Sequence, residues 1–183
     1  MTDDAIHSAR LDLIVGTPAF YEASLAGDHA RAEALIGAAI PPDWFADRGI
    51  LTTFQGKLQR DPLYQPWALR AVILRAEQRM IGHIGFHTPP DPAYLQALAP
   101  GGIEIGYTIY SDYQRQGYAK EATAALIDWA YTSHHLTRFV LSISPDNVPS
   151  TRIATGLGFI QIGSQIDEED GLELVYRLDI IQG

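Results

Sequence analysis

The chain has 183 residues, and 13 basic against 22 acidic side chains give it a formal net charge of −9. This length suits a single domain with a core of its own, and the absence of cysteine excludes disulfides, cysteine zinc sites, iron–sulfur clusters and a thiol nucleophile. The acidic balance argues against nonspecific binding to nucleic acids or anionic membranes, because both require a basic surface, and it leaves room for a cationic substrate.

The start of the chain carries acidic residues and a histidine, but no apolar stretch of the kind found in signal peptides. The longest apolar runs are far shorter than the ~20 residues that a membrane-spanning helix needs. We therefore expect a cytoplasmic protein without a membrane or nucleic-acid partner. The oligomeric state, monomer or homodimer, stays open.

The first third of the chain is expected to form one strand followed by helices. Apolar residues at alternate positions over 11–15 predict the strand. Capping residues, prolines and glycines then mark the ends of helices over residues 18–26, 28–36 and 43–60.

From Trp67 the pattern changes to short β-branched runs that predict strands. Residues 68–75 and 80–86 form a predicted hairpin, and Gly82 within its second strand suggests a close approach of another backbone. A loop over residues 88–102, with four prolines and two glycines, is long enough to suggest a functional role.

The second half alternates helices and strands. Residues 103–109 and 138–143 predict strands, and residues 118–133 predict a helix with a buried stripe of Ala119, Ala122, Leu126 and Ala130. A short helix within 146–157 and two strands over 159–166 and 172–180, joined by an acidic turn over 167–171, complete the chain. The order predicts a mixed α/β (α+β) fold, with a mostly antiparallel sheet of about seven strands flanked by helices.

A polar loop over residues 111–117 leads directly into the N-terminus of the helix 118–133. The first turn of a helix presents unpaired N–H groups and the positive end of its dipole, so such a loop can bind a phosphate. The same residues also suit an ordinary turn in which Gly117 only permits the backbone geometry. The spacing matches neither the P-loop nor the dinucleotide-binding fingerprint.

Several blocks of sequence resemble the GCN5-related N-acetyltransferase (GNAT) family. The loop Gln114-Arg115-Gln116-Gly117-Tyr118-Ala119 matches the Gln/Arg-x-x-Gly-x-Gly/Ala motif of that family. Downstream, Arg138-Phe139-Val140-Leu141 resembles the next strand, and Asn147-Val148-Pro149-Ser150 with Gly156-Leu157-Gly158-Phe159 resembles the block that closes the cofactor site. Upstream, Glu104-Ile105-Gly106-Tyr107 resembles a strand common in the subgroup related to ribosomal-protein N-acetyltransferases.

The resemblance covers residues 67–179 well and the N-terminal helices only loosely. It implies a single GNAT domain over residues 1–183, with 1–66 on the acceptor side and 67–183 as the acetyl-CoA-binding core. The activity implied is transfer of the acetyl group of acetyl-CoA to a primary amine, at a protein N-terminus or on a small molecule, by direct attack.

The resemblance also implies which residues bind acetyl-CoA. Backbone amides over residues 115–119 would hold the pyrophosphate, and the strand end at Ile109 and Tyr110 would pair with the pantetheine arm. Asn147 would hydrogen-bond that arm, and no metal is expected. The residues expected at the cofactor are Ile109, Tyr110, Gln114, Arg115, Gln116, Gly117, Tyr118, Ala119, Asn147 and Ser150.

Glu104 and Ser150 are the expected catalytic residues. Glu104 would accept the amine proton directly or through a water, although a surface glutamate at a strand edge is the alternative. A partly buried carboxyl with its pKa near the working pH suits the role of base. Many relatives carry a tyrosine acid where this chain has Ala154, so Ser150 either hydrogen-bonds the departing sulfur or only caps a helix.

Two other functions would use the same motifs. A non-catalytic acyl-CoA-binding sensor or interaction module fits Ala154, because it needs no acid, and a nucleotide-binding enzyme would prefer ATP or NAD to coenzyme A. The amine acceptor is expected near residues 40–60, the loop 88–102 and the last hairpin. His83 and His87 share one strand face, where one of them lines the acceptor groove or both bind a metal; the lack of a third ligand disfavours the metal.

Overall fold

The structure is a computed structural model that describes residues 5–167 and 171–181. The chain divides into two compact units, each made of two segments. The first unit is Met1–Gly85 with Tyr107–Ala125, and the second is Phe86–Gly106 with Leu126–Gly183. This division does not follow the boundary expected at residue 66, and the assignment of 1–183 to one domain stays a prediction.

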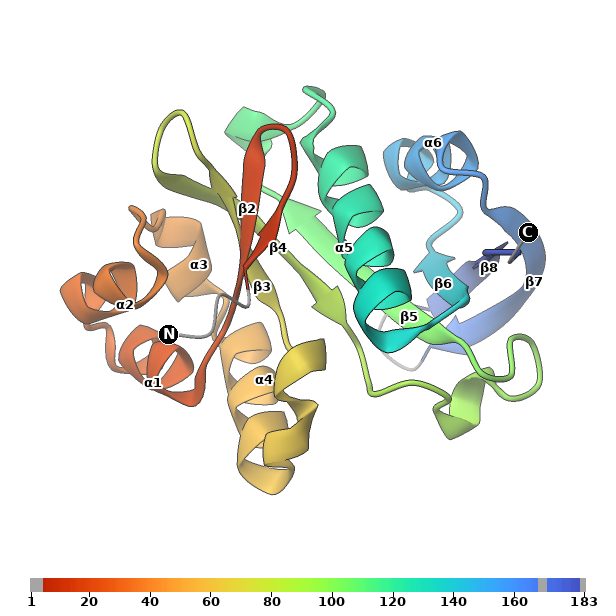
Figure 1. Cartoon of the computed structure of the whole chain (residues 1–183), viewed down its shortest axis with the longest axis horizontal. Helices are drawn as coiled ribbons and strands as arrows, with labels where there is room; N and C mark the ends of the chain where they lie inside the picture. The colour runs from red at the N-terminus through yellow and green to blue at the C-terminus, as the bar shows by residue number, and fades with distance from the viewer. Residues whose placement is uncertain (1–4, 168–170, 182–183) are drawn as a thin grey trace. The chain divides into compact units, whose positions relative to one another are not determined.

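Strands of the first unit pair antiparallel in chain order, as Figure 1 shows. They are β1 (Ile6–His7), β2 (Leu11–Val15), β3 (Arg70–Leu74) and β4 (Arg79–Phe86), the last of which runs on into the second unit. Leu13 lies opposite Val72, and both side chains are fully buried. The sequence pattern missed β1, because two residues are too few to show an alternation.

Four helices follow β2, and the caps Thr17 and Asp28 of the first two confirm the signals in the sequence, whereas Asp43, expected to cap the third, lies inside it. They are α1 (Pro18–Ala26), α2 (His29–Ile36), α3 (Pro42–Ala46) and α4 (Arg48–Arg60), followed by the 3₁₀ turn η1 (Pro62–Trp67). The helix expected over 43–60 is two helices. Asp47 ends α3, and its carboxylate accepts a hydrogen bond from the Ile50 N–H at 3.1 Å, which starts α4.

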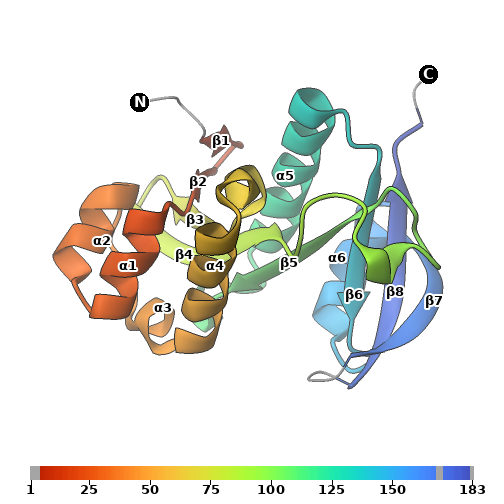
Figure 2. The ribbon, with the colours of Figure 1, turned by 90° about the horizontal axis from the view of Figure 1, so that it is seen from below.

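The core of the first unit is aromatic. Phe20 stacks on Trp44 with ring centroids 5.3 Å apart, and Tyr21 stacks on Phe54 at 6.4 Å. The Trp44 indole N–H donates to the hydroxyl of Ser24 at 2.9 Å, so the one polar atom of this buried ring is satisfied. Figure 2 shows α1 to α4 grouped beside the strands whose apolar side chains join this core.

The second unit holds the C-terminal strands and one helix. They are β6 (Arg138–Ile143), β7 (Ile160–Asp167), β8 (Gly171–Asp179) and α6 (Val148–Gly156). In Figure 2, β8 lies between β6 and β7, and it pairs antiparallel with both. Most of the expected acidic turn, residues 168–170, lies outside the described residues.

Besides β4, two further elements pass through both units: β5 (Ile103–Ile109) and the long helix α5 (Tyr118–His134). On α5, the side chains of Ala122, Leu126 and Ala130 are fully buried and Ala119 is half-buried, which confirms the predicted stripe. The strand order is β1-β2-β3-β4-β5-β6-β8-β7, with eight strands rather than about seven. This order confirms the mixed, mostly antiparallel sheet. Across the described part of the chain, no helix combines the length and hydropathy required to cross a membrane.

Candidate functional site

The polar loop before α5 contains two residues with left-handed backbone conformations. After the turn η3 (Ser111–Tyr113), Arg115 and Gly117 both adopt left-handed conformations, with φ of 61° and 84°. Alternation of left-handed residues turns successive backbone N–H groups toward one side of a loop. The Gln114 side chain donates to the Ile109 carbonyl at 2.9 Å and closes the loop at its start. Side chains of the loop from Gln114 to Gln116 are exposed.

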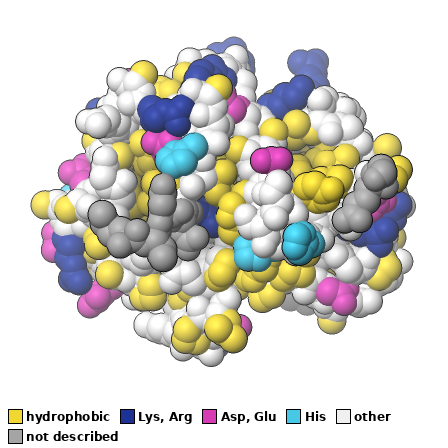
Figure 3. Space-filling view, in the orientation of Figure 1, with side chains coloured by type: hydrophobic (Ala, Val, Ile, Leu, Met, Phe, Trp, Pro, Cys, Tyr) yellow, Lys and Arg dark blue, Asp and Glu magenta, His cyan; other side chains and the backbone are white. Residues whose placement is uncertain are grey.

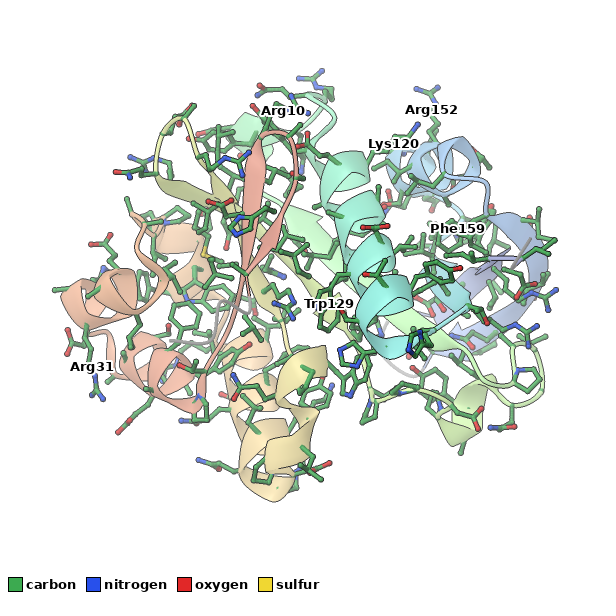
Figure 4. All side chains as sticks on the ribbon, viewed as in Figure 1. Arg10, Arg31, Lys120, Trp129, Arg152 and Phe159 are labelled. Carbon is green, nitrogen blue, oxygen red and sulfur yellow. The ribbon has the colours of Figure 1, made fainter. Side chains whose placement is uncertain are left out.

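Arg10 is a neighbour of this loop that the sequence analysis missed. It lies in the turn before β2, and its guanidinium donates to the Gln116 carbonyl at 3.2 Å and packs 4.3 Å from the Tyr118 ring centre. Figure 4 labels Arg10 and, on α5, Lys120. A pairing between residues so far apart in sequence leaves no local signal, so only the fold reveals it.

Glu121, in the first turn of α5, forms an ion pair with Arg10. Its carboxylate accepts from the Arg10 Nε and from the Ser8 hydroxyl, each at 2.7 Å. Burial raises the pKa of Glu121, but these hydrogen bonds outweigh it and hold the pKa below its usual range. The side chain is therefore ionised near neutral pH, at the end of a helix where a negative charge is favourable.

Ile109 and Tyr110, expected to pair with pantetheine, lie at the end of β5. The Tyr110 N–H donates to the Ile81 carbonyl at 2.9 Å, so this N–H already serves the contact with β4. The Ile109 carbonyl accepts the Gln114 side-chain amide at 2.9 Å. Within the second unit, β5 pairs with β6 at Ile103–Phe139 and Glu104–Val140.

In the second unit, Glu104 is buried and closely hydrogen-bonded. Only 3% of the residue is exposed. The Tyr94 hydroxyl donates to Oε2 at 2.7 Å, and the His87 Nδ1 lies 3.5 Å from the same oxygen. A surface glutamate, the alternative reading of this residue, is therefore wrong.

The pKa of Glu104 differs from the value expected of a base near neutral pH. Burial raises it, but hydrogen bonds from His87, Ser142 and Tyr94, together with the charge of His87, lower it more, and the pKa lies below its usual range. A hydrogen bond to a carboxylate favours its charged form. Glu104 is consequently ionised near neutral pH and accepts hydrogen bonds in that form.

Asn147 and Ser150 lie at the start of α6. The Asn147 side-chain oxygen accepts the Ser150 N–H at 3.1 Å, so Asn147 caps this helix. Ser150 is half-buried at the third helical position. Ala154, on the same helix, is fully buried, and its side chain has no proton to donate to the departing sulfur.

His83 belongs to the core of the first unit. Its ring lies 5.8 Å from that of Trp44, and burial lowers its pKa to about 4, which leaves the imidazole neutral. The His83 Nδ1 and the Tyr110 hydroxyl are buried without a hydrogen-bond partner in the described structure. Within residues 5–167 and 171–181, no three His, Cys, Asp or Glu side chains are grouped as metal ligands.

Charged side chains of both signs are interspersed on the face drawn in Figure 3. On a chain with a net charge of −9, a phosphate site would depend on local backbone amides and on single cations such as Arg10.

The model of the family described as acetyltransferase (GNAT) domain matches residues 17–160. The chain belongs to the GNAT family. The matched range includes Glu104, the loop before α5 and the cap of α6, so the family assignment confirms the resemblance that these blocks carry.

Named relatives of this GNAT chain include N-acetyltransferases of bacteria. The uncharacterized N-acetyltransferase YnaD of Bacillus subtilis is 33% identical over 92 residues, which are 50% of this chain and 49% of YnaD. The ribosomal-protein-serine acetyltransferase of Escherichia coli is 32% identical over 111 residues, 61% of this chain and 56% of that protein. The aligned part thus spans only 49% and 56% of these relatives.

Solved structures share the GNAT fold. RimL, a ribosomal L7/L12 alpha-N-protein acetyltransferase in complex with coenzyme A, superposes with a TM-score of 0.65 at 18% identity, over 96% of this chain and 98% of its own. The microcin C7 self-immunity acetyltransferase MccE, in complex with acetyl-CoA and AMP, gives 0.62 at 17% identity, over 94% and 93%. At such identities the likeness establishes the fold alone.

Proposed function

We propose that this protein transfers the acetyl group of acetyl-CoA to a primary amine. The observation that carries the proposal is the GNAT family match over residues 17–160, within which the loop before α5 has the left-handed turns of an anion site at Arg115 and Gly117. Structures of the same fold in complex with acetyl-CoA or coenzyme A support this choice of donor.

The cofactor is proposed to bind through the residues that match the family motifs. Backbone amides over residues 115–119 hold the pyrophosphate, with the charge of Arg10 beside them. The N–H of Ile109 pairs with the pantetheine arm, and the Asn147 amide nitrogen, which the helix cap does not use, donates to the same arm.

The acceptor proposed is the amine of a protein or peptide. Relatives that are named for acetylating ribosomal proteins support this class, whereas a small-molecule amine is the alternative. The loop 88–102, which carries Tyr94 and thereby contacts Glu104, is the proposed acceptor-binding segment within the second unit.

The reaction proposed is a direct displacement. The amine loses a proton, its lone pair forms the new C–N bond at the thioester carbonyl, and the C–S bond breaks to release the thiolate of coenzyme A. Glu104 is the proposed carboxylate for removal of the amine proton. A thiol of coenzyme A leaves as a thiolate without an acid, so Ala154 is compatible with turnover, and Ser150 is the remaining candidate to hydrogen-bond the sulfur.

A non-catalytic acyl-CoA-binding module is the second candidate, and Ala154 is the observation that favours it. Initial rates of thiol release, with acetyl-CoA and a panel of peptide and small amines varied in turn, separate the two functions. Direct transfer predicts amine-dependent release with intersecting double-reciprocal lines, since both substrates bind before reaction; parallel lines would indicate a covalent acetyl-enzyme. Coenzyme A binding without amine-dependent release would favour the module.

A further inference from the structure

Two polar atoms of the first unit are buried and have no hydrogen-bond partner in the described part of the chain. They are the Nδ1 of His83, on β4, and the hydroxyl oxygen of Tyr110, directly after β5. Only 4% of His83 is exposed, and its ring meets that of Tyr110 edge to face with centroids 6.4 Å apart. Unpaired buried polar atoms are destabilising, so those that a native protein keeps call for a partner that the chain itself does not supply.

Helix α3 brings two acidic side chains to the same part of the first unit. Asp43 and Asp47 are four residues apart, and the Asp47 N–H donates to the Asp43 carbonyl at 3.3 Å, so one helical turn puts both side chains on one side. Between them in sequence, Trp44 packs with its ring 5.8 Å from that of His83, so α3 contacts β4. Both acidic residues are exposed.

The charges on α3 act on both buried groups. Burial raises the pKa of the Tyr110 hydroxyl, and the charges of Asp43 and Asp47 raise it further. Burial lowers the pKa of His83 to about 4, and the charge of Asp47 acts in the opposite direction. Near neutral pH the phenol and the imidazole are therefore neutral, and each has a lone pair that can accept an N–H. These four side chains make up the α3 subsite: Asp43, Asp47, His83 and Tyr110.

No cation of the described part of the chain neutralises the acids of the α3 subsite. One carboxylate oxygen of Asp47 accepts the Ile50 N–H at 3.1 Å, and neither Asp43 nor Asp47 forms an ion pair there. The nearest basic side chain in sequence, Arg48, donates instead to the Leu25 carbonyl at 3.2 Å. The subsite thus combines negative charge with unused hydrogen-bond acceptors, and a cation with N–H donors would satisfy both.

We propose that the α3 subsite binds a second, protonated amino group of the amine acceptor; this inference rests on the proposed acetyl transfer. An alkylammonium group has three N–H donors and one positive charge, which match the acceptor atoms and the charge of the subsite. Tyr110 directly follows Ile109, whose N–H is proposed to pair with pantetheine, and α3 lies within residues 40–60, where the acceptor is expected. Acceptors of this class are peptides with a lysine next to the free N-terminus, and small diamines.

Acceptors matched in all but one charge test the subsite. Two peptides share a free N-terminus and carry either lysine or the uncharged norleucine as the second residue, and mass spectrometry locates the acetyl group. The unaltered protein should acetylate the N-terminus of the lysine peptide with a kcat/KM ~5–20-fold higher, the size of two partly exposed ion pairs. 1,4-Diaminobutane against butylamine makes the same comparison for small amines, and the pair with the larger preference identifies the source of the ammonium group.

The variant Asp43→Asn/Asp47→Asn removes both charges and keeps a side-chain oxygen to cap α4. Its preference should be lost through a higher KM for the charged acceptor, with the KM for acetyl-CoA unchanged. Asp28→Asn/Asp61→Asn is the matched control, because both residues are exposed caps in the same unit and the net charge changes equally. This control should keep the preference. Tyr110→Phe, which removes only the hydroxyl, should weaken the preference without loss of thermal stability.

The proposal is overturned if the unaltered protein acetylates both members of each pair equally well. It is also overturned if the preference survives in Asp43→Asn/Asp47→Asn or falls equally in the control, because the buried atoms would then need only water as a partner. In each of these cases acetyl transfer itself still takes place. Failure of the proposed function is a different result: none of the four acceptors would be acetylated by the unaltered protein, and this inference would fall with it.

Discussion

At Glu104, burial and hydrogen bonding act on one carboxyl group in opposite directions, and the hydrogen bonds prevail. The native protein therefore holds this carboxyl ionised at a pH where the unfolded chain has begun to protonate it. By linkage, the group contributes stability that is fully present above its unfolded pKa and lost as the pH falls through the lower folded pKa.

The variant Glu104→Gln removes that dependence on pH. The free energy of unfolding of the unaltered protein, relative to Glu104→Gln, should be constant near neutral pH and should fall as the pH drops below 4.5, the ordinary value of this carboxyl. Urea denaturation at a series of pH values measures the difference. A difference that grew on acidification would show that the folded pKa is raised instead.

A substitution at Gly117 tests whether the loop before α5 binds the cofactor. Its φ of 84° is strained for any side chain, so Gly117→Ala should lower the free energy of unfolding by ~1–2 kcal/mol and weaken acetyl-CoA binding measured by calorimetry. Gly27, which ends α1 with φ of 70°, is the matched control: Gly27→Ala should lose similar stability and keep its affinity for acetyl-CoA. Equal affinity in both variants would remove the loop from the cofactor site.

At the start of α6, one side chain has two roles that can be tested separately: capping the helix and binding the cofactor. Asn147 caps the helix with its oxygen and is proposed to donate to the cofactor with its nitrogen. Asn147→Asp keeps the capping oxygen, so the melting temperature should hold while the KM for acetyl-CoA rises. Asn147→Ala should lose both, with ~1 kcal/mol of stability for the cap. An unchanged KM in Asn147→Asp would leave the residue with capping alone.

The close approach of β4 and β5 requires a glycine at position 82. A Cβ on Gly82 would lie 2.1 Å from the Thr108 carbonyl oxygen, which is backbone and cannot rotate away. Gly82→Ala should therefore lower the free energy of unfolding by at least ~1–3 kcal/mol, as overpacking does. Gly56→Ala on α4, where the new methyl makes an ordinary contact, should instead raise it by ~0.5–1 kcal/mol. Equal stabilities in thermal unfolding would contradict the close approach.

Local chemistry explains which elements were predictable from sequence. Thr17 and Asp28 each cap the helix that directly follows them, so the sequence carries the whole signal. Asp47 was missed because it ends a helix of five residues and starts another without a break in the apolar pattern. The partners Arg10–Glu121 and His87–Glu104 depend on strand pairing and loop closure, which no short window of sequence encodes.

For the whole molecule, the net charge of −9 is compatible with an anionic cofactor only if attraction is local. In the proposed cofactor site, the loop before α5 would supply this attraction through backbone amides and Arg10, which also pairs with Glu121. The sequence predicted this loop and the family, because motif residues lie close together. The acceptor was less predictable, since it depends on segments outside those motifs.

The measurement that tests the central claim most directly quantifies acetylated amine and free coenzyme A in one reaction. Peptides with a free N-terminal amine, matched peptides with a blocked N-terminus, and small amines are each incubated with the protein and acetyl-CoA, and both products are measured by mass spectrometry. The account predicts the two products in equal amounts, formed only with a free amine. Binding of acetyl-CoA with no acetylated amine across the whole panel would contradict it.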